Sequence, residues 1–283
     1  MLLVGDVIYL NAEVVSGLGE DTFWTWFHRE FPSSVFEEPE RLEDCDVVLR
    51  YSTLGFLPIV GKQVALCWEL YPAMAERFGI SSWDEKTAVV RETARYATYR
   101  TVASDLTRAE YETFGRVDVI PIGVDVELFR PLPDKQGLRA KYGLPTDREI
   151  GVWIGTAHPM KGFALLLEYA RQNHDVHWIT ICKTESESVC MPNGSNFIHV
   201  PQQTSCELIN AADFFLSTSL LRPFFMAEWE AMACNVPMRI IGEPRKEFTP
   251  SSSPRNDVLE LGWDRPSVKK QWEQFFSERG IRW

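Results

Sequence analysis

Short apolar runs alternate with amphipathic stretches along the first 125 residues of the chain. Five runs have the length and composition of buried strands. They cover residues 2–4, 46–49, 63–68, 101–104 and 117–122. Apolar side chains recur at helical spacing over 20–31, with Phe23, Phe27 and Phe31 on one face, and a second helix is expected over 84–98. This pattern predicts strand–helix units, which build a parallel sheet with helices on both faces.

A polar, proline-rich segment at 130–134 interrupts this pattern, and the same alternation then begins again. Further strands are predicted at 149–154, 176–182, 196–200, 213–217 and 237–241, and further helices at 161–172, 205–211, 226–234 and 267–278. The serine-rich stretch at 250–254 is expected to be a surface loop. We therefore expect an α/β protein with a Rossmann-like domain over 1–130 and a second one over 131–265. In such folds ligands bind beyond the carboxyl ends of the strands.

Composition and charge narrow the range of possible binding partners. The 283 residues are 45% hydrophobic and 24% charged, as in globular proteins, and the formal net charge is −11. Residues 1–130 carry 22 acidic and 12 basic side chains, whereas residues 131–283 carry 18 and 17. A basic footprint for nucleic acid is therefore absent from the overall charge. The negative charge of the first half favours neutral over polyanionic partners for that half.

Cysteine usage and hydropathy bear on location. None of the six cysteines forms a C-x-x-C pair, which argues against a zinc site and fits a reducing compartment. No run approaches the ~18 apolar residues of a membrane span, and no basic segment precedes a long apolar stretch at the N-terminus. We expect a cytoplasmic protein without a transmembrane segment.

Three segments carry the candidate chemistry. The first reads VIPIGVD at 119–125 and continues with FRP at 129–131; the second reads WIGT at 153–156 and PMKG at 159–162. The third reads ADFFLSTS at 212–219 and EAMACNVP at 230–237. Together they resemble the GT-B glycosyltransferases of the retaining family-4, or "group 1", type. The resemblance implies two Rossmann-like domains facing each other across a cleft. It also implies a final helix, within 266–283, that returns to the first domain.

Lys161 is the candidate for binding the donor diphosphate. It follows a predicted strand and turn at an expected helix start, where its ammonium adds to the anion preference of helix N–H groups. The resemblance implies that Lys161 stabilises the leaving diphosphate as the glycosidic bond breaks. Gly155, Thr156 and His158 lie in the same turn, and His158 is a candidate donor to a phosphate oxygen. Taken without the motif, Lys161 would be an ordinary solvated lysine.

Glu230 occupies the later position of the family's E-x7-E motif, where the carboxylate accepts hydrogen bonds from the ribose hydroxyls. The earlier glutamate of that motif is Arg222 here, and the family's turn arginine is Thr156. Two interpretations are open: Arg222 compensates for the lost arginine, or the site has lost catalysis. Phe225 and Met226 stand in P-F-F-M, where the family has G-F-G-L, so an altered donor-sugar pocket with bulkier side chains is expected.

The first half offers weaker candidates. Gly17 and Gly19 resemble the family's glycine-rich loop after the first strand, which contacts the donor, although an ordinary turn is an equal alternative. Glu69 is a candidate for acceptor deprotonation. Trp68 and Tyr71 are candidates for stacking on a sugar ring or an extruded base. The D-C-D sequence at 44–46 is interpreted as a chance pattern, and no metal site is expected.

The resemblance implies a metal-independent hexosyl- or pentosyltransferase. It would take a UDP- or GDP-sugar as co-substrate, need no further cofactor, and transfer the sugar with retention to a hydroxyl acceptor. Alternatives are a phage-type enzyme acting on a hydroxymethylated DNA base, a catalytically inert nucleotide-sugar-binding module, and an epimerase or phosphorylase of the same fold. The acceptor (a glycan, a small molecule or a modified base) and the oligomeric state are left open.

Overall fold

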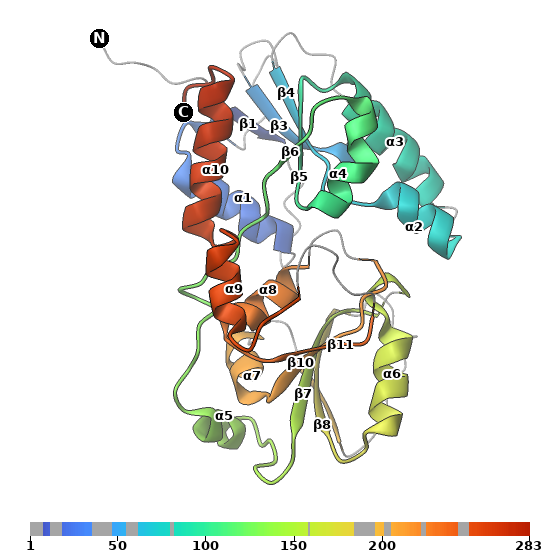
Figure 1. Ribbon diagram of the computed structural model, residues 1–283, viewed down its shortest axis with the longest axis vertical. Helices are drawn as coiled ribbons and strands as arrows, with labels where there is room; N and C mark the ends of the chain where they lie inside the picture. The colour runs from blue at the N-terminus through green and yellow to red at the C-terminus, as the bar shows by residue number, and fades with distance from the viewer. Residues whose placement is uncertain are drawn as a thin grey trace. The chain divides into compact units, whose positions relative to one another are not determined.

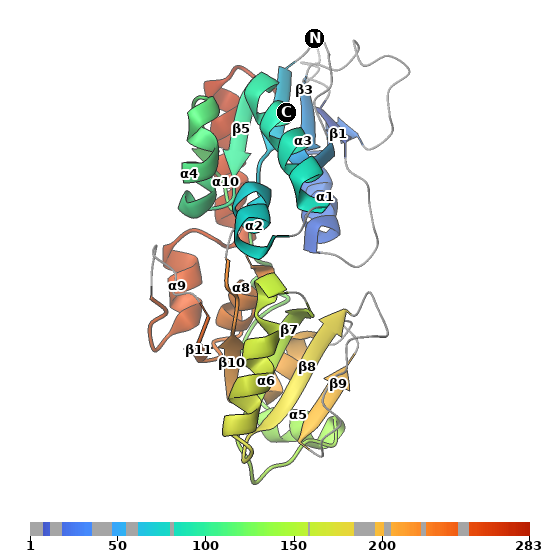
Figure 2. The same cartoon turned by 90° about the vertical axis from the view of Figure 1, so that its right-hand side faces the viewer.

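The computed structural model describes residues 8–11, 19–35, 47–54, 62–79, 82–157, 159–183, 196–200, 205–221, 225–242 and 249–283. The chain divides into two compact units. Unit 1 contains residues 1–123 and 266–283, and unit 2 contains residues 124–265, so that residues 124–130 cluster with the second unit. Each unit is a parallel sheet covered by helices (Figures 1 and 2).

The described part of unit 1 is built on a sheet in the order β2-β1-β3-β4-β5-β6, and every pair in it is parallel. Its strands are β1 (Ile8–Asn11), β2 (Ser34–Val35), β3 (Val47–Tyr51), β4 (Lys62–Leu66), β5 (Tyr99–Val102) and β6 (Asp118–Val119). Its helices are α1 (Gly19–Glu30), α2 (Tyr71–Phe78), α3 (Ser82–Tyr96), α4 (Asp105–Tyr111) and α10 (Arg265–Glu278), with 3-10 turns η2 (Ser52–Leu54) and η3 (Glu112–Phe114). The strand predicted at 2–4 lies outside the described residues.

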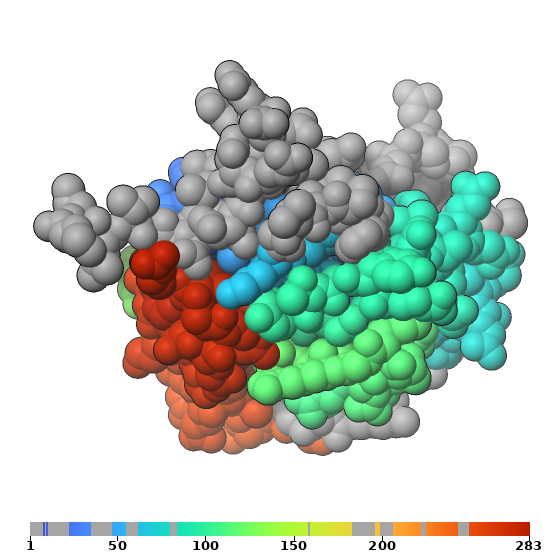
Figure 3. Space-filling view, turned by 90° about the horizontal axis from the view of Figure 1, so that it is seen from above, coloured from blue at the N-terminus to red at the C-terminus, as the bar shows by residue number. Residues whose placement is uncertain are grey.

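Aromatic side chains fix α1 and α10 on one face of this sheet, and α3 and α4 cover the other (Figure 1). The ring of Phe27 meets Trp272 edge-on at 5.3 Å, and Phe31 meets Phe276 at 5.5 Å between centroids. All four side chains are fully buried. Burial of such large rings supplies much of the free energy that holds two helices together. Figure 3 shows α10 in red beside the green surface of α4 and the segment that follows it.

The described part of unit 2 has a sheet in the order β11-β10-β7-β8-β9, and its pairs are again parallel. Its strands are β7 (Ile150–Thr156), β8 (His177–Lys183), β9 (Phe197–Val200), β10 (Phe214–Ser217) and β11 (Met238–Ile240). Its helices are α5 (Lys135–Lys141), α6 (Phe163–Gln172), α7 (Ser205–Ala211), α8 (Met226–Ala233) and α9 (Pro254–Glu260), with a 3-10 turn η4 (Pro159–Lys161). The chain runs outward from β7 to β9 and then returns to β10 on the other side of β7. The topological switch point therefore lies between β7 and β10, where such sheets bind ligands at the strands' carboxyl ends.

Two helices of unit 2 were not foreseen. α5 begins after Asp134, whose carboxylate accepts a hydrogen bond from the Gly137 N–H at 2.8 Å and so caps the helix. The prediction of a surface loop over 250–254 is wrong at its last residue, because α9 begins at Pro254. The α9 side chain Arg255 donates to three carbonyl oxygens of other segments, those of Val126, Phe129 and Ala233. Because these contacts join residues distant in sequence, the local sequence of α9 gives little indication that a helix forms there.

Candidate functional site

The carboxyl end of β7 supplies two of the predicted donor-binding residues, Gly155 and Thr156. Thr156 pairs in register with Lys183 of β8. A Cβ atom on Gly155 would lie 3.1 Å from the Trp153 ring and 3.7 Å from the Cβ of Lys161. The missing side chain therefore lets the end of β7 pass close to the turn that carries Lys161.

Lys161 ends the 3-10 turn η4, and Gly162 follows it with φ of 65°, a left-handed conformation that favours glycine. A Cβ atom on Gly162 would lie only 1.9 Å from the carbonyl oxygen of Thr218. The turn after β7 is therefore pressed against the segment after β10. α6 begins at Phe163, two residues later than expected from the sequence, so Lys161 immediately precedes its amino-terminal end. His158, predicted to lie in the same turn, is outside the described residues.

The hydroxyl of Thr218 joins the two segments at the switch point. It donates to the carbonyl oxygen of Lys161 at 2.6 Å and accepts a hydrogen bond from the Trp153 indole N–H at 2.9 Å. Two residues beyond Thr218, the Leu220 N–H donates to the carbonyl oxygen of Met160 at 2.9 Å. Thr218 and Trp153 are 1% and 2% exposed, so these bonds are shielded from water. The backbone position of Lys161 is thus fixed by a polar chain that the motif did not reveal.

Phe225 contacts the side chain of Lys161 directly. The Lys161 ammonium lies 3.1 Å from the centroid of the Phe225 ring, in a cation–π arrangement. Phe225 is buried, and it caps α8, whose first residue is Met226. The described structure therefore brings Gly155, Phe225 and Lys161 together. Arg222, predicted to lie near them, is outside the described residues.

Glu230 projects from α8 and is half-buried. Burial raises the pKa of its carboxyl to about 7; negative charge on Cys206 acts in the same direction, and the guanidinium of Arg265 opposes both. Arg265 is itself paired with Asp125 at 2.8 Å. A carboxyl that titrates near neutral pH can change between a hydrogen-bond donor and a pure acceptor under ordinary conditions.

A second glutamate of α8, Glu228, has a different environment. It is 4% exposed and accepts a hydrogen bond from the hydroxyl of Ser217, the last residue of β10. This bond fixes α8 against the end of β10. The motif identified Glu230 and gave no role to Glu228, whose partner Ser217 lies 11 positions earlier in the chain.

The predicted residues of the first half all belong to unit 1. Gly19 is the first residue of α1 rather than part of a loop, and Gly17 is outside the described residues. Glu69 follows β4 and is half-buried, and its carbonyl oxygen accepts a hydrogen bond from the Tyr111 hydroxyl at 2.7 Å. The stacking role considered for Trp68 is wrong for this structure. Its side chain is 4% exposed and packs edge-on against Phe23 at 4.7 Å.

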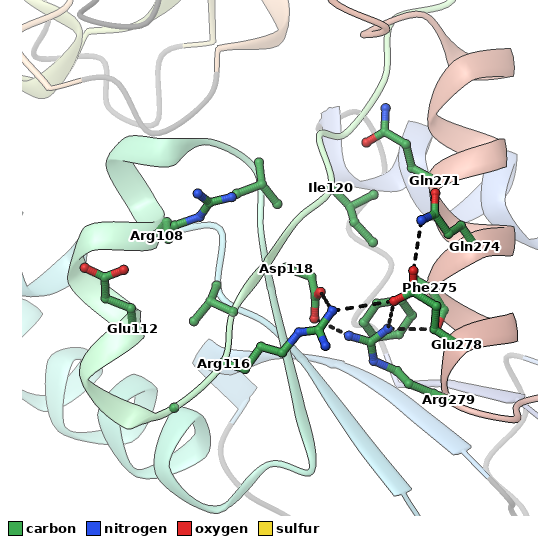
Figure 4. Close-up of a pocket in the computed structure, with 13 residues that line it drawn as sticks. Arg108, Glu112, Arg116, Asp118, Ile120, Gln271, Gln274, Phe275, Glu278 and Arg279 are labelled. Atoms are coloured by element: carbon green, nitrogen blue, oxygen red, sulfur yellow. Dashed lines mark hydrogen bonds and ion pairs between the residues drawn. The ribbon is translucent and has the colours of Figure 1, made fainter.

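A polar groove of about 590 Å³ lies elsewhere in unit 1, between α4 and η3 on one side and α10 on the other (Figure 4). At its centre Arg116, Asp118, Glu278 and Arg279 point toward one another. Arg116 contacts Asp118 at 3.0 Å and Glu278 at 3.5 Å, and Arg279 pairs with both acids. None of the predicted site residues lines this groove, and its charges neutralise one another.

Within the described ranges, no group of three or more histidine, cysteine or acidic side chains is placed to hold a metal ion. Among the helices of those same ranges, none combines the length and apolar character needed to cross a bilayer.

Comparison with known proteins supports the fold. No family model matches the chain. Two curated relatives, the D-inositol 3-phosphate glycosyltransferases of Mycobacterium tuberculosis H37Rv and Mycobacterium bovis BCG Pasteur, are each 28% identical to it over 137 residues. The matched region is 44% of this chain and only 28% of each relative, so the chain spans well under half of their length.

Solved structures resemble the chain along almost its whole length. Anabaena Alr3699/HepE, in a complex with UDP and glucose, gives a TM-score of 0.76 at 12% identity, covering 97% of this chain and 100% of that one. Sucrose-phosphate synthase from Thermosynechococcus elongatus gives 0.69 at 15% identity, covering 94% and 81%. These likenesses and the two parallel sheets confirm the predicted GT-B fold. The expected resemblance to GT-B glycosyltransferases is likewise confirmed.

Proposed function

We propose that this chain, a GT-B protein that resembles glycosyltransferases, transfers a sugar from a uridine-diphosphate donor bound at the switch point of unit 2. The observation that carries the proposal is the position of Lys161. It combines a cationic side chain with the amino end of α6, beside the carboxyl ends of β7 and β10. UDP is favoured over GDP because Anabaena HepE, which has the same fold, is seen with UDP and with UDP-glucose.

In this proposal each candidate site residue of unit 2 has a defined role. The Lys161 ammonium neutralises charge that grows on the diphosphate as the glycosidic bond breaks, which lowers the barrier. The backbone around Gly155 and Thr156 approaches the phosphates. Glu230, once ionised, accepts hydrogen bonds from the two ribose hydroxyls. Phe225 shields one side of the Lys161 ammonium from water.

The finer features are proposals as well. We expect retention of configuration, with the leaving phosphate assisting the incoming hydroxyl, and turnover that chelators leave unchanged. Arg222, Met226 and His158 are assigned to the donor side from the motif segments, and Glu69 is assigned to acceptor deprotonation because it follows β4. Neutral glycans and small hydroxyl compounds are the acceptor classes to test first.

Calorimetric titration with UDP, UDP-glucose, GDP and ADP tests the central claim. Loss of a charge-assisted contact costs about 1.5–3 kcal/mol, so Lys161→Ala and Glu230→Ala should each weaken UDP binding by about tenfold or more. Lys141→Ala and Glu168→Ala are matched controls, because both side chains are exposed in ion pairs of unit 2. Binding that is absent, or that falls equally in the control variants, would overturn the proposal. UDP binding without transfer or hydrolysis would instead indicate an inert donor-binding module.

A further inference from the structure

The polar groove of unit 1 lies at the open edge of its sheet. β6 is the last strand of the described sheet, and Val119 of β6 lines the groove. Val119 pairs in register with Val102 of β5, and the Ile120 N–H donates to the Val102 carbonyl oxygen at 2.8 Å. In a parallel ladder this pairing places the N–H and C=O of Val119 itself on the other side of the strand, away from β5. The floor of the groove therefore presents one backbone donor and one backbone acceptor.

The two walls of the groove carry side chains whose hydrogen-bonding capacity is only partly used. Arg116 has a side chain that is 73% exposed, and both of its ion pairs, with Asp118 and Glu278, are made by Nη2. Its Nε and Nη1 groups remain available as donors among the described residues. On the α10 wall, Gln274 donates to Glu278 at 2.9 Å, and its own carbonyl oxygen has no donor within the described ranges. On the η3 wall (Figure 4), the Glu112 carboxylate makes no ion pair with any described residue.

The charges that line the groove balance. They belong to three arginines and three acids: Arg108, Arg116, Arg279, Glu112, Asp118 and Glu278. An anion would meet the carboxylates and a cation the guanidinium groups, so neither sign of charge is favoured. Arg279 is also fixed in place, because its 7% exposed side chain pairs with Asp118 and donates to the Phe275 carbonyl oxygen at 3.0 Å. A neutral ligand that both donates and accepts hydrogen bonds therefore matches the groove, and little side-chain freedom is lost when it binds.

We propose that this groove binds a neutral carbohydrate, either a disaccharide or a short oligosaccharide. Each sugar hydroxyl is both a donor and an acceptor, so a sugar chain can use the free donors of Arg116 and the free acceptors of Gln274 and Glu112 together. The volume of about 590 Å³ is that of a small-molecule site rather than of an ion site. All of the lining residues belong to unit 1, so this site is separate from the donor site proposed in unit 2.

The open edge of β6 raises the alternative that an extended peptide adds to the sheet as a further strand. β6 is only two residues long (Asp118–Val119), so it offers few backbone hydrogen bonds to such a peptide. Strand addition would also leave the free groups of Arg116, Gln274 and Glu112 unused. The side chains of the walls therefore favour a carbohydrate over a peptide.

Saturation-transfer-difference NMR titrations with maltotriose, cellotriose and isomaltotriose test the site. All three are neutral; trigalacturonate serves as the acidic analogue, and tetra-alanine with an acetylated and an amidated end as the peptide. We expect at least one neutral trisaccharide to bind. Its affinity should change by less than about twofold between about 0.05 and 0.3 M NaCl, because a neutral ligand makes no charge attraction that salt can screen.

Substitutions in the walls place the bound sugar. Arg116→Ala and Gln274→Ala should each weaken trisaccharide binding by about fivefold or more, because each removes hydrogen bonds to the ligand. Arg91→Ala and Gln172→Ala are matched controls outside the groove. Arg91 forms an ion pair of unit 1, and Gln172 donates to a glutamate four positions away, as Gln274 does. All four side chains are exposed, so each variant should keep its melting temperature within about 2 °C of the wild type.

Failure of all three neutral trisaccharides to bind would overturn the proposal. Tighter binding of trigalacturonate or of the peptide than of every neutral trisaccharide would do the same, as would an equal loss of affinity in the control variants. Lys161→Ala should leave trisaccharide binding unchanged, and a loss there would place the sugar at the donor site instead. The site does not depend on the proposed transfer reaction, because failure to bind UDP would count against that function alone.

Discussion

Replacing Gly162 by alanine tests how the candidate phosphate turn is built. A Cβ atom at this position would meet two separate costs. The left-handed φ of 65° disfavours any L side chain by about 1–2 kcal/mol. The 1.9 Å approach to the Thr218 carbonyl oxygen is far inside normal contact, so the backbone must move by more than an ångström. Overpacking of this kind costs about 1–3 kcal/mol. Gly162→Ala should therefore destabilise the protein by about 2–5 kcal/mol.

Gly143→Ala is the matched control for this substitution. Gly143 has almost the same φ, 63°, but a Cβ atom there would meet nothing within 4 Å. It should carry only the conformational cost of about 1–2 kcal/mol. Thermal unfolding should therefore show a decrease in melting temperature of about 6–15 °C for Gly162→Ala and about 3–6 °C for Gly143→Ala, taking about 3 °C per kcal/mol. Equal decreases would refute the claim that the turn is pressed against Thr218.

Three further predictions concern the same unit. Thr218→Val removes the hydroxyl that accepts from the buried Trp153 indole N–H and donates to the Lys161 carbonyl oxygen. This change should lower the free energy of unfolding by about 1–3 kcal/mol and raise the KM for the sugar donor. Thr218→Ser keeps the hydroxyl and should restore both hydrogen bonds. Because Glu230 has a pKa raised to about 7, its neutral form stabilises the fold. As the pH rises from about 4.5 to 7, the free energy of unfolding of the wild-type protein should fall relative to that of Glu230→Gln. UDP binding should strengthen over the upper part of the same range. Stability profiles of the wild type and Glu230→Gln that run parallel would contradict this. Arg255→Met leaves three carbonyl oxygens without their shared donor and should cost about 3 kcal/mol in urea unfolding, with a smaller cost for Arg255→Lys.

The elements that the sequence predicted best are those with strong apolar faces. The helix expected over 20–31 is found at Gly19–Glu30, and that over 267–278 at Arg265–Glu278, because their aromatic side chains are spaced for burial on one side. α5 and α9 escaped prediction because they are short and polar. α5 depends on a cap at Asp134, and α9 on the contacts of Arg255 with residues more than 20 positions away.

For the candidate site, the motif identified Lys161 and Glu230 but not what surrounds them. The polar chain from Trp153 through Thr218 to Lys161 links residues 57 and 65 positions apart, and the Phe225 ring reaches Lys161 from another segment again. Such contacts arise only when β7 and β10 lie side by side in the sheet. The residue types can therefore suggest that Lys161 binds phosphate. The contacts that position its ammonium depend on the order of the strands in the sheet.

The helix α10 has a consequence for how the protein is made. Unit 1 draws its chain from both sides of unit 2, and α10 supplies Trp272 and Phe276, which cover Phe27 and Phe31 of α1. A ribosome releases α1 first and α10 after all of unit 2. Unit 2, being continuous, can complete its core while unit 1 still lacks these partners. During synthesis the core of unit 1 should therefore stay incomplete until α10 packs, and the exposed aromatic face of α1 is where we expect a nascent-chain chaperone to bind.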